Sequence, residues 1–287
     1  MRLTAENTAL VLDSTADLPD ARERSPNWRT VHLYVRFGEE VFREYAELSP
    51  EEFYERLRAS KEPPRSSQPS PADFETVFES LDRYERVLCV LLSAKLSGTA
   101  ESARLAVEAK NDKRVVVIDS GVISGGAVLL ADAIQRRLER GTTDEAVEEL
   151  VESFRRERGL LFTVDTLDYL VRGGRVGKAA GFAGQLLSVK PILTFEDGEV
   201  APLKRVRGRT KALAELARIF AEATRDDPSL HVGVAQADAV SDAEDLVARV
   251  RALRPRASLD LTSVLGPVIG THGGPGTLGL FWYHDEL

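Results

Sequence analysis

The chain has 287 residues, of which 43% are hydrophobic, 29% charged and 7% aromatic, and its formal net charge is −8. This composition supplies a packed core and excludes disordered and fibrous proteins, while the length suits one large domain or two of ordinary size. The negative charge argues against a dedicated nucleic-acid binder, which would have to neutralise phosphates.

In the first part of the chain, short β-type runs alternate with longer amphipathic stretches, which is the pattern of parallel strands joined by crossover helices. Two helix starts carry capping signals, Ser49-Pro50-Glu51-Glu52 and Ser70-Pro71. The predicted strands are Ala9–Asp13, Val31–Arg36, Val87–Leu92, Val115–Asp119 and Leu160–Thr163. The predicted helices lie near Ser49–Arg58, Ala72–Leu81, Ser97–Ala109, Gly125–Arg140 and Thr143–Arg158.

The pattern changes after residue 164, where Gly173 and Gly174 interrupt a predicted short helix at Asp165–Arg172. We therefore predict two α/β domains, residues 1–164 with a mainly parallel sheet flanked by helices and residues 165–287 with a mixed sheet, and a ligand site near their interface. The second domain is predicted to contain helices near Lys178–Leu187, Arg209–Ala223 and Asp242–Leu253, a hairpin of Ile192–Phe195 and Glu199–Leu203, and strands at His231–Ala235, Ser258–Thr262 and Thr277–Trp282.

The location of the protein is predicted from cysteine content and hydropathy. The single cysteine, Cys89, lies in an apolar run, so it forms no internal disulfide and is expected to be buried. We find neither a signal-peptide pattern nor the ~18 consecutive apolar residues of a membrane span. We therefore expect a cytoplasmic protein without an integral membrane segment.

Three polar motifs follow predicted strands or precede predicted helices. The first predicted strand leads into Asp13-Ser14-Thr15-Ala16-Asp17-Leu18-Pro19. The carboxylate and two hydroxyls of this motif suit ligand binding at the end of a parallel strand, or else they form a capped turn. The second motif is Ser66-Ser67-Gln68-Pro69-Ser70. It either supplies neutral hydrogen-bond donors to an oxyanion or is a polar loop before a helix. The third motif is Leu96-Ser97-Gly98-Thr99, at the start of a predicted helix. It either forms an anion site at the helix N-terminus, or Ser97 is simply an N-cap.

Two glycine-rich motifs lie in the second half. The first is Arg172-Gly173-Gly174-Arg175, which suits either binding of an anion or a sharp turn between domains. The second is Gly270-Thr271-His272-Gly273-Gly274-Pro275-Gly276, whose glycines allow the backbone to approach a ligand closely. Gly274 to Gly279 formally matches G-x-G-x-x-G, but eight residues follow it, too few for a dinucleotide-binding helix and its acidic residue. We also find no ATP-binding loop and no metal-ligand spacing, so we expect no metal and no cofactor.

Taken in order, the motifs at 13–19, 66–70, 96–99, 119–120, 173–175 and 271–276 resemble the DegV family over nearly the whole chain. The resemblance implies a two-domain α/β protein that binds a long-chain fatty acid. Some members resemble the fatty-acid-binding subunits of bacterial fatty acid kinase, in which a separate ATP-binding subunit phosphorylates the bound carboxylate to an acyl-phosphate.

The resemblance also implies roles for particular residues. The family holds the carboxylate with the threonine of a Thr-Ser-Gln-Pro motif, here Ser66, and with the serine of Leu-Ser-Gly-Thr, here Ser97, beside Gly98. His272 matches the family's histidine near the head group, with a role in phosphoryl transfer, and Arg207 is the best match for a kinase-contacting arginine, ahead of Arg205 and Arg209. We expect supporting roles for Asp13, Ser14, Thr15, Arg175, Gly273 and Gly274.

From these residues we expect a fatty-acid carrier that has no catalytic activity alone. Its acyl chain is expected in an apolar tunnel within the first domain, and uncharged donors are expected to hold its carboxylate near the domain interface. Two alternatives stay open: a hydrolase or transferase that uses Asp13 and His272 as an acid–base pair, and a regulatory module that binds lipid only to signal.

Overall fold

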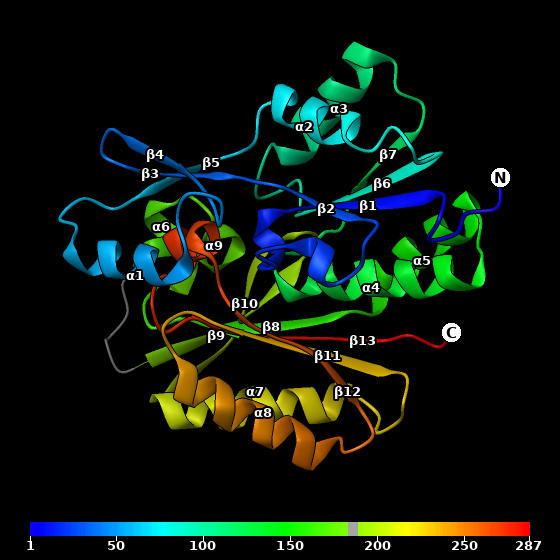
Figure 1. The fold of residues 1–287 in the computed structure, drawn as a ribbon. Helices are drawn as coiled ribbons and strands as arrows, with labels where there is room; N and C mark the ends of the chain where they lie inside the picture. The colour runs from blue at the N-terminus through cyan, green and yellow to red at the C-terminus, as the bar shows by residue number, and fades with distance from the viewer. Residues whose placement is uncertain (183–188) are drawn as a thin grey trace.

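The computed structural model describes residues 1–182 and 189–287, and in this part of the chain the strands form three sheets (Figure 1). The first sheet is four-stranded and parallel, in the order β2-β1-β6-β7. Its strands are β1 (Thr8–Asp13), β2 (Trp28–Val31), β6 (Arg86–Leu91) and β7 (Val115–Asp119). Every residue of β1 is buried, as expected for a central parallel strand covered on both faces.

The second sheet is mixed and six-stranded, in the order β10-β9-β8-β13-β11-β12. Strands β11 and β12 run parallel, and the other neighbouring strands run antiparallel. Its strands are β8 (Gly159–Thr163), β9 (Val189–Glu196), β10 (Glu199–Arg207), β11 (Leu230–Gln236), β12 (Ser258–Val264) and β13 (Leu278–His284). The last strand of the chain, β13, therefore lies in the middle of this sheet.

The third sheet is small and antiparallel, in the order β4-β3-β5, and consists of β3 (Tyr34–Phe37), β4 (Glu40–Arg43) and β5 (Arg65–Ser67). It packs against the short helix α9 (Pro267–Gly273). This contact brings the polar strand β5 next to the glycine-rich segment that precedes β13.

Helices cover the two larger sheets in layers (Figure 1). Helix α4 (Gly125–Arg140) contacts strands of both sheets and lies between them, with α5 (Asp144–Glu157) beside it. The outer face of the first sheet carries α2 (Pro71–Glu79) and α3 (Thr99–Lys110), and the outer face of the second carries α7 (Arg209–Ala223) and α8 (Val240–Leu253). The remaining helices are α1 (Pro50–Ala59), α6 (Asp168–Arg172) and the 3-10 turns η1 (Ser14–Ala16), η2 (Ala21–Glu23) and η3 (Gly177–Phe182).

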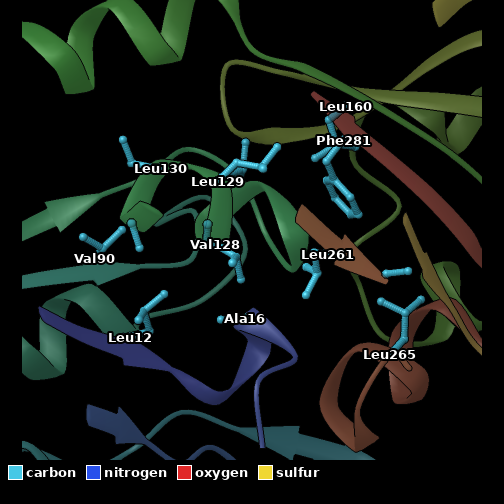
Figure 2. Packing of buried hydrophobic residues seen from close by; sticks show 14 of the residues in the cluster. Leu12, Ala16, Val90, Val128, Leu129, Leu130, Leu160, Leu261, Leu265 and Phe281 are labelled. Atoms are coloured by element: carbon cyan, nitrogen blue, oxygen red, sulfur yellow. The ribbon is translucent and has the colours of Figure 1, made fainter. Parts of the chain in front are cut away.

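The largest hydrophobic cluster fills the space between the first and second sheets. Side chains of α4 lie between those of the two sheets (Figure 2), as the labelled residues Leu12, Val90, Val128, Leu129, Leu160 and Phe281 show. The two halves of the chain thus share one apolar core.

The α/β class with a parallel and a mixed sheet is confirmed, and so is the burial of Cys89. Both predicted helix starts are also correct, because Ser49 with Glu52 and Ser70 with Asp73 form complete capping boxes. The division at residues 164 and 165 stays a prediction. Strand β8 lies in the second sheet, so the chain passes from one sheet to the other before Gly159.

Four local predictions were wrong or incomplete. The predicted strand Val31–Arg36 is two strands in different sheets, because the chain leaves the first sheet at His32. Strands β4 and β5 and helix α9 were not predicted. Helix α3 begins at Thr99 with Gly98, not Ser97, as its N-cap. Of the predicted helix Lys178–Leu187, the described part is the 3-10 turn η3, and the remainder lies outside the described residues.

Candidate ligand site

A cavity of about 320 Å³ lies between the two larger sheets, and its wall is mostly apolar. The apolar side chains come from both halves of the chain and include Leu33, Ile123, Phe162, Phe195, Ile269 and Phe281. The expectation that a tunnel would lie within the first domain is therefore wrong for this cavity. The strands of the second sheet supply one wall, because their inward-facing side chains alternate with those that pack under α7 and α8.

Two predicted polar residues meet in the wall of the cavity. The hydroxyl Oγ of Ser66 lies 2.7 Å from Nε2 of His272. Ser66 is held by the pairing of β5 with β3, opposite Val35, and His272 lies in the last turn of α9. The packing of α9 against the third sheet thus creates a hydrogen bond between residues that are 206 positions apart.

The imidazole of His272 is neutral over the physiological range. Burial and, to a smaller degree, the nearby guanidinium of Arg175 lower the pKa of His272 to about 4. Its Nδ1 is buried and has no hydrogen-bond partner among the described residues. Since unpaired buried N–H groups are rarer than unpaired acceptors, the proton belongs on Nε2, which then donates to Ser66. The hydroxyl proton of Ser66 is consequently free to donate into the cavity.

Ser97 lines the same cavity, at the start of α3. Its Oγ lies 2.8 Å from Thr99 Oγ1 and accepts a hydrogen bond from the Thr99 backbone N–H at 3.3 Å. The predicted cap interaction therefore exists, although Gly98 is the capping position. First-turn amides without helical partners lie beside this hydroxyl, as an anion site would require.

Gln68 connects the Ser66 segment to the Ser97 segment. Its Nε2 donates to the Gly98 carbonyl at 3.2 Å and to Ser102 Oγ at 2.9 Å. A Cβ at Gly98 would lie 2.4 Å from Gln68 Oε1, so a side chain at this position would displace the glutamine. The two loops that carry the serines are thus held together by one amide side chain.

Arg175 also lines the cavity, so the predicted uncharged donors share it with a cation. Its Nε donates to the Leu96 carbonyl at 3.2 Å and its guanidinium to the Gly173 carbonyl at 2.6 Å. Among the described residues no carboxylate forms an ion pair with it. The positive charge therefore stays available to an anion in the cavity.

The motif at residues 13–19, at the end of β1, mainly holds neighbouring segments of the chain in place. The buried Asp13 accepts hydrogen bonds from Thr15 and from the Leu92 backbone N–H at 2.7 Å, and burial raises the pKa of Asp13. Ser14 Oγ accepts the Leu33 backbone N–H at 2.9 Å. These bonds join β1 to β6 and to the segment that enters the third sheet, and Thr15 is the predicted residue of this motif that reaches the cavity.

The two predicted glycines after His272 allow the chain to turn from α9 into β13. A Cβ at Gly273 would lie 2.8 Å from Thr277 Oγ1. Gly274 has φ +74°, and a Cβ there would lie 2.3 Å from the ring of Tyr169. Gly273 itself lines the cavity, so its backbone is within reach of a ligand.

Two buried carboxyls that hold α9 in place were missed as site residues. Asp17 Oδ1 accepts the Gly266 backbone N–H at 2.8 Å, and Glu44 Oε1 accepts the Val268 backbone N–H at 2.7 Å. Burial raises the pKa of Asp17 to about 7 and the pKa of Glu44 to about 8. Asp17 lies in the polar motif at residues 13–19, which the sequence indicates as a candidate ligand-binding motif. In contrast, the residues around Glu44 form no motif that distinguishes it from a surface glutamate.

The arginines of the basic segment have different environments. Arg205 stacks on the ring of Phe182, 3.9 Å from its centroid, and donates to the Gly181 carbonyl at 3.1 Å. Arg209 donates to Asp242 at 2.7 Å. Arg207 is exposed on β10, and no hydrogen bond or ion pair of its side chain occurs within residues 1–182 and 189–287. The side chain of Arg207 is therefore not held by another group of the described part of the chain, whereas Arg205 and Arg209 are.

Neither a metal site nor a membrane helix is present in the described part of the chain. No three His, Cys, Asp or Glu side chains are grouped so that they could hold a metal ion. No described helix combines the length and the apolar character that crossing a bilayer demands.

Comparison with known proteins gives a consistent result. Residues 7–285 match the family model described as "Uncharacterised protein, DegV family". A fatty acid-binding protein of Thermotoga maritima is 36% identical over 277 residues, covering 94% of this chain and 95% of that protein. A solved structure described as fatty acid binding of a DegV family protein from Thermus thermophilus superposes with a TM-score of 0.91 at 35% identity, covering 97% of this chain and 99% of that one.

A further solved structure, the fatty acid kinase B3 protein of Streptococcus pneumoniae loaded with linoleic acid, shares the fold at a TM-score of 0.84 and 24% identity, covering 97% of this chain and 100% of that one. The family model spans the first and second sheets and the whole cavity wall between them. The chain belongs to the DegV family.

Proposed function

We propose that this protein binds a long-chain fatty acid in the cavity and presents its carboxylate to a separate ATP-dependent kinase subunit. The observation that carries the proposal is the composition of the cavity: a mostly apolar wall with Ser66, Ser97, Arg175 and His272 grouped on it. An apolar ligand with one anionic end matches this distribution of groups. The fatty acid-binding relatives support the same ligand class.

The acyl chain and the carboxylate of the ligand contribute differently to the free energy of binding. Burial of about a dozen methylenes at ~0.8 kcal/mol each supplies roughly 10 kcal/mol, which offsets much of the cost of association. A carboxylate buried without donors would cost several kcal/mol. The hydroxyls of Ser66 and Ser97, the amide of Gly98 and the guanidinium of Arg175 avoid that cost, so the head group determines orientation and the tail determines affinity.

The arrangement of the head-group residues suits phosphoryl transfer to the fatty acid. The neutral His272 fixes the Ser66 hydroxyl without withdrawing charge from the carboxylate. A carboxylate oxygen can then attack the terminal phosphorus of ATP held by the partner, forming the acyl-phosphate bond while the bond to ADP breaks. In this proposal His272 positions Ser66, and the exposed Arg207 contacts the kinase subunit.

The geometry does not favour a hydrolase or transferase that uses Asp13 and His272. The carboxylate of Asp13 is occupied by Thr15 and Leu92, and His272 is hydrogen-bonded to Ser66. A lipid-sensing module would bind the same ligand, and it differs from the proposed function in that the lipid leaves chemically unchanged.

The test is solvent extraction of the purified protein and mass spectrometry of the extract, followed by uptake of added stearate. We expect a bound fatty acid and one equivalent of uptake. With ATP alone the lipid should remain unchanged, and with ATP and an ATP-binding kinase subunit it should become an acyl-phosphate. A protein that carries no fatty acid and takes up none would contradict the proposal.

A further inference from the structure

We propose that Phe281 forms the closed end of the cavity and sets the longest acyl chain that the protein accepts. This inference rests on the proposed function and adds the residue that determines its specificity. Phe281 lies in β13, its side chain is 3% exposed, and its ring lines the cavity.

The Phe281 ring is surrounded by glycines from three elements. A Cβ at Gly125, the first residue of α4, would lie 2.8 Å from the ring, and one at Gly279 in β13 would lie 2.9 Å from it. A Cβ at Gly126 in α4 would lie 3.5 Å from the Phe281 ring, and one at Gly233 in β11 would lie 3.7 Å from it. Glycine is unfavourable in helices and in strand interiors, and here it provides the space that the ring occupies.

Enclosure by backbone makes the ring a fixed wall. Because α4, β11 and β13 approach it directly, the ring cannot withdraw from the cavity without moving one of these elements. Figure 2 shows Phe281 beside Leu160, its partner across β13 and β8, and near Leu261. A wall of this kind gives an abrupt limit to ligand length, whereas a flexible side chain would give a gradual one.

Phe281 and the polar group lie in different parts of the cavity. His272 contacts Ser66 and Gly173, whereas the Phe281 ring contacts the start of α4. A Cβ at Gly273, next to His272, would lie 2.8 Å from Thr277 Oγ1, and Phe281 lies four residues further along the chain than Thr277. At ~3.4 Å per strand residue, the backbone of Phe281 lies about 14 Å from that of Thr277, and the ring extends back over Gly279. A fatty acid with its carboxylate at Ser66 therefore directs its methyl end toward Phe281.

The experiment compares the affinities of saturated acids from myristate through palmitate, stearate and arachidate to behenate for the wild-type protein and for Phe281→Ala and Phe281→Leu. In the wild type, affinity should rise about fourfold per added methylene until the chain reaches the ring, and then fall. The optimum of Phe281→Ala should shift to a longer acid in the series, and that of Phe281→Leu should shift less or equally. If the alanine variant does not fold, the leucine variant carries the test.

Phe220→Ala is the matched control. Phe220 is fully buried and packs edge-on against Trp282, with ring centroids 5.5 Å apart, in the cluster on the opposite face of the second sheet. It should keep the wild-type optimum despite a comparable loss of core volume. Folded Phe281 variants that bind fatty acid with the wild-type optimum would overturn this inference alone. A wild-type protein that binds no acid of the series would overturn the proposed function as well.

Discussion

Gly173→Ala tests whether fatty-acid binding depends on the position of the His272 ring. Gly173 follows α6, and a Cβ there would lie 2.1 Å from His272 Nδ1 and 3.1 Å from the Tyr169 carbonyl oxygen. Since non-bonded heavy atoms settle at roughly 3.5 Å, the ring must move by more than about 1 Å. The substitution adds one methyl group and removes no group that would touch the ligand.

The displacement breaks the hydrogen bond of 2.7 Å between Ser66 and His272. The loss of one hydrogen bond and the unpaired polar atoms it leaves together cost roughly 1–3 kcal/mol, which corresponds to about 5- to 150-fold weaker binding if the cost falls on the bound state. Displacement of a fluorescent fatty acid measures this change. An NMR titration of His272 should also show a changed pKa, because the ring leaves the position in which burial and Arg175 lower its pKa to about 4.

Gly181→Ala is the control, because a Cβ at that position would have no atom of residues 1–182 and 189–287 within 4 Å. It should bind fatty acid as the wild type does. The reasoning is refuted if Gly173→Ala keeps both the wild-type affinity and the wild-type pKa of His272, since the ring would then have found room without disturbing the site.

Three further predictions concern other parts of the account. Ser66→Ala and Ser97→Ala should each weaken binding by roughly 1 kcal/mol, about fivefold, and a double variant with wild-type affinity in the displacement assay would exclude both hydroxyls from the site. Burial raises the pKa values of Asp17 and Glu44 to about 7 and 8, so between roughly pH 4 and 8 these two carboxyls bind more protons in the folded protein than in the unfolded chain, and their contribution to the free energy of unfolding falls as pH rises. Asp17→Asn combined with Glu44→Gln should flatten that slope in urea titrations, and an unchanged slope would disprove this origin. Arg207→Ala should bind fatty acid normally but slow acyl-phosphate formation with the kinase subunit, and an unchanged rate would exclude Arg207 from the contact.

The α/β class was predictable because its signals are local. The buried strands are short apolar runs, and the starts of α1 and α2 carry serine, proline and an acidic residue at fixed spacing. The third sheet lacks such a signal, since β5 is the three-residue polar segment Arg65–Ser67. The change of sheet at His32 depends on the hydrogen bond from Leu33 to Ser14, which is a tertiary contact.

Helix α9 shows why the geometry of the site was less predictable than its residues. Glycine is a poor helix former, and no helix was predicted around His272. Tertiary contacts hold the helix instead: Glu44 accepts the Val268 N–H, and a Cβ at Gly270 would lie 2.5 Å from Phe53. These contacts join segments more than 200 positions apart, so no local pattern could place His272 beside Ser66.

The most direct test of the account is a crystal structure of the protein with stearate bound. We predict that the carboxylate oxygens lie within hydrogen-bond distance of the Ser66 and Ser97 hydroxyls and that the acyl chain extends between the two sheets toward Phe281. A carboxylate at the Phe281 end of the cavity, or a fatty acid bound elsewhere on the protein, would contradict it.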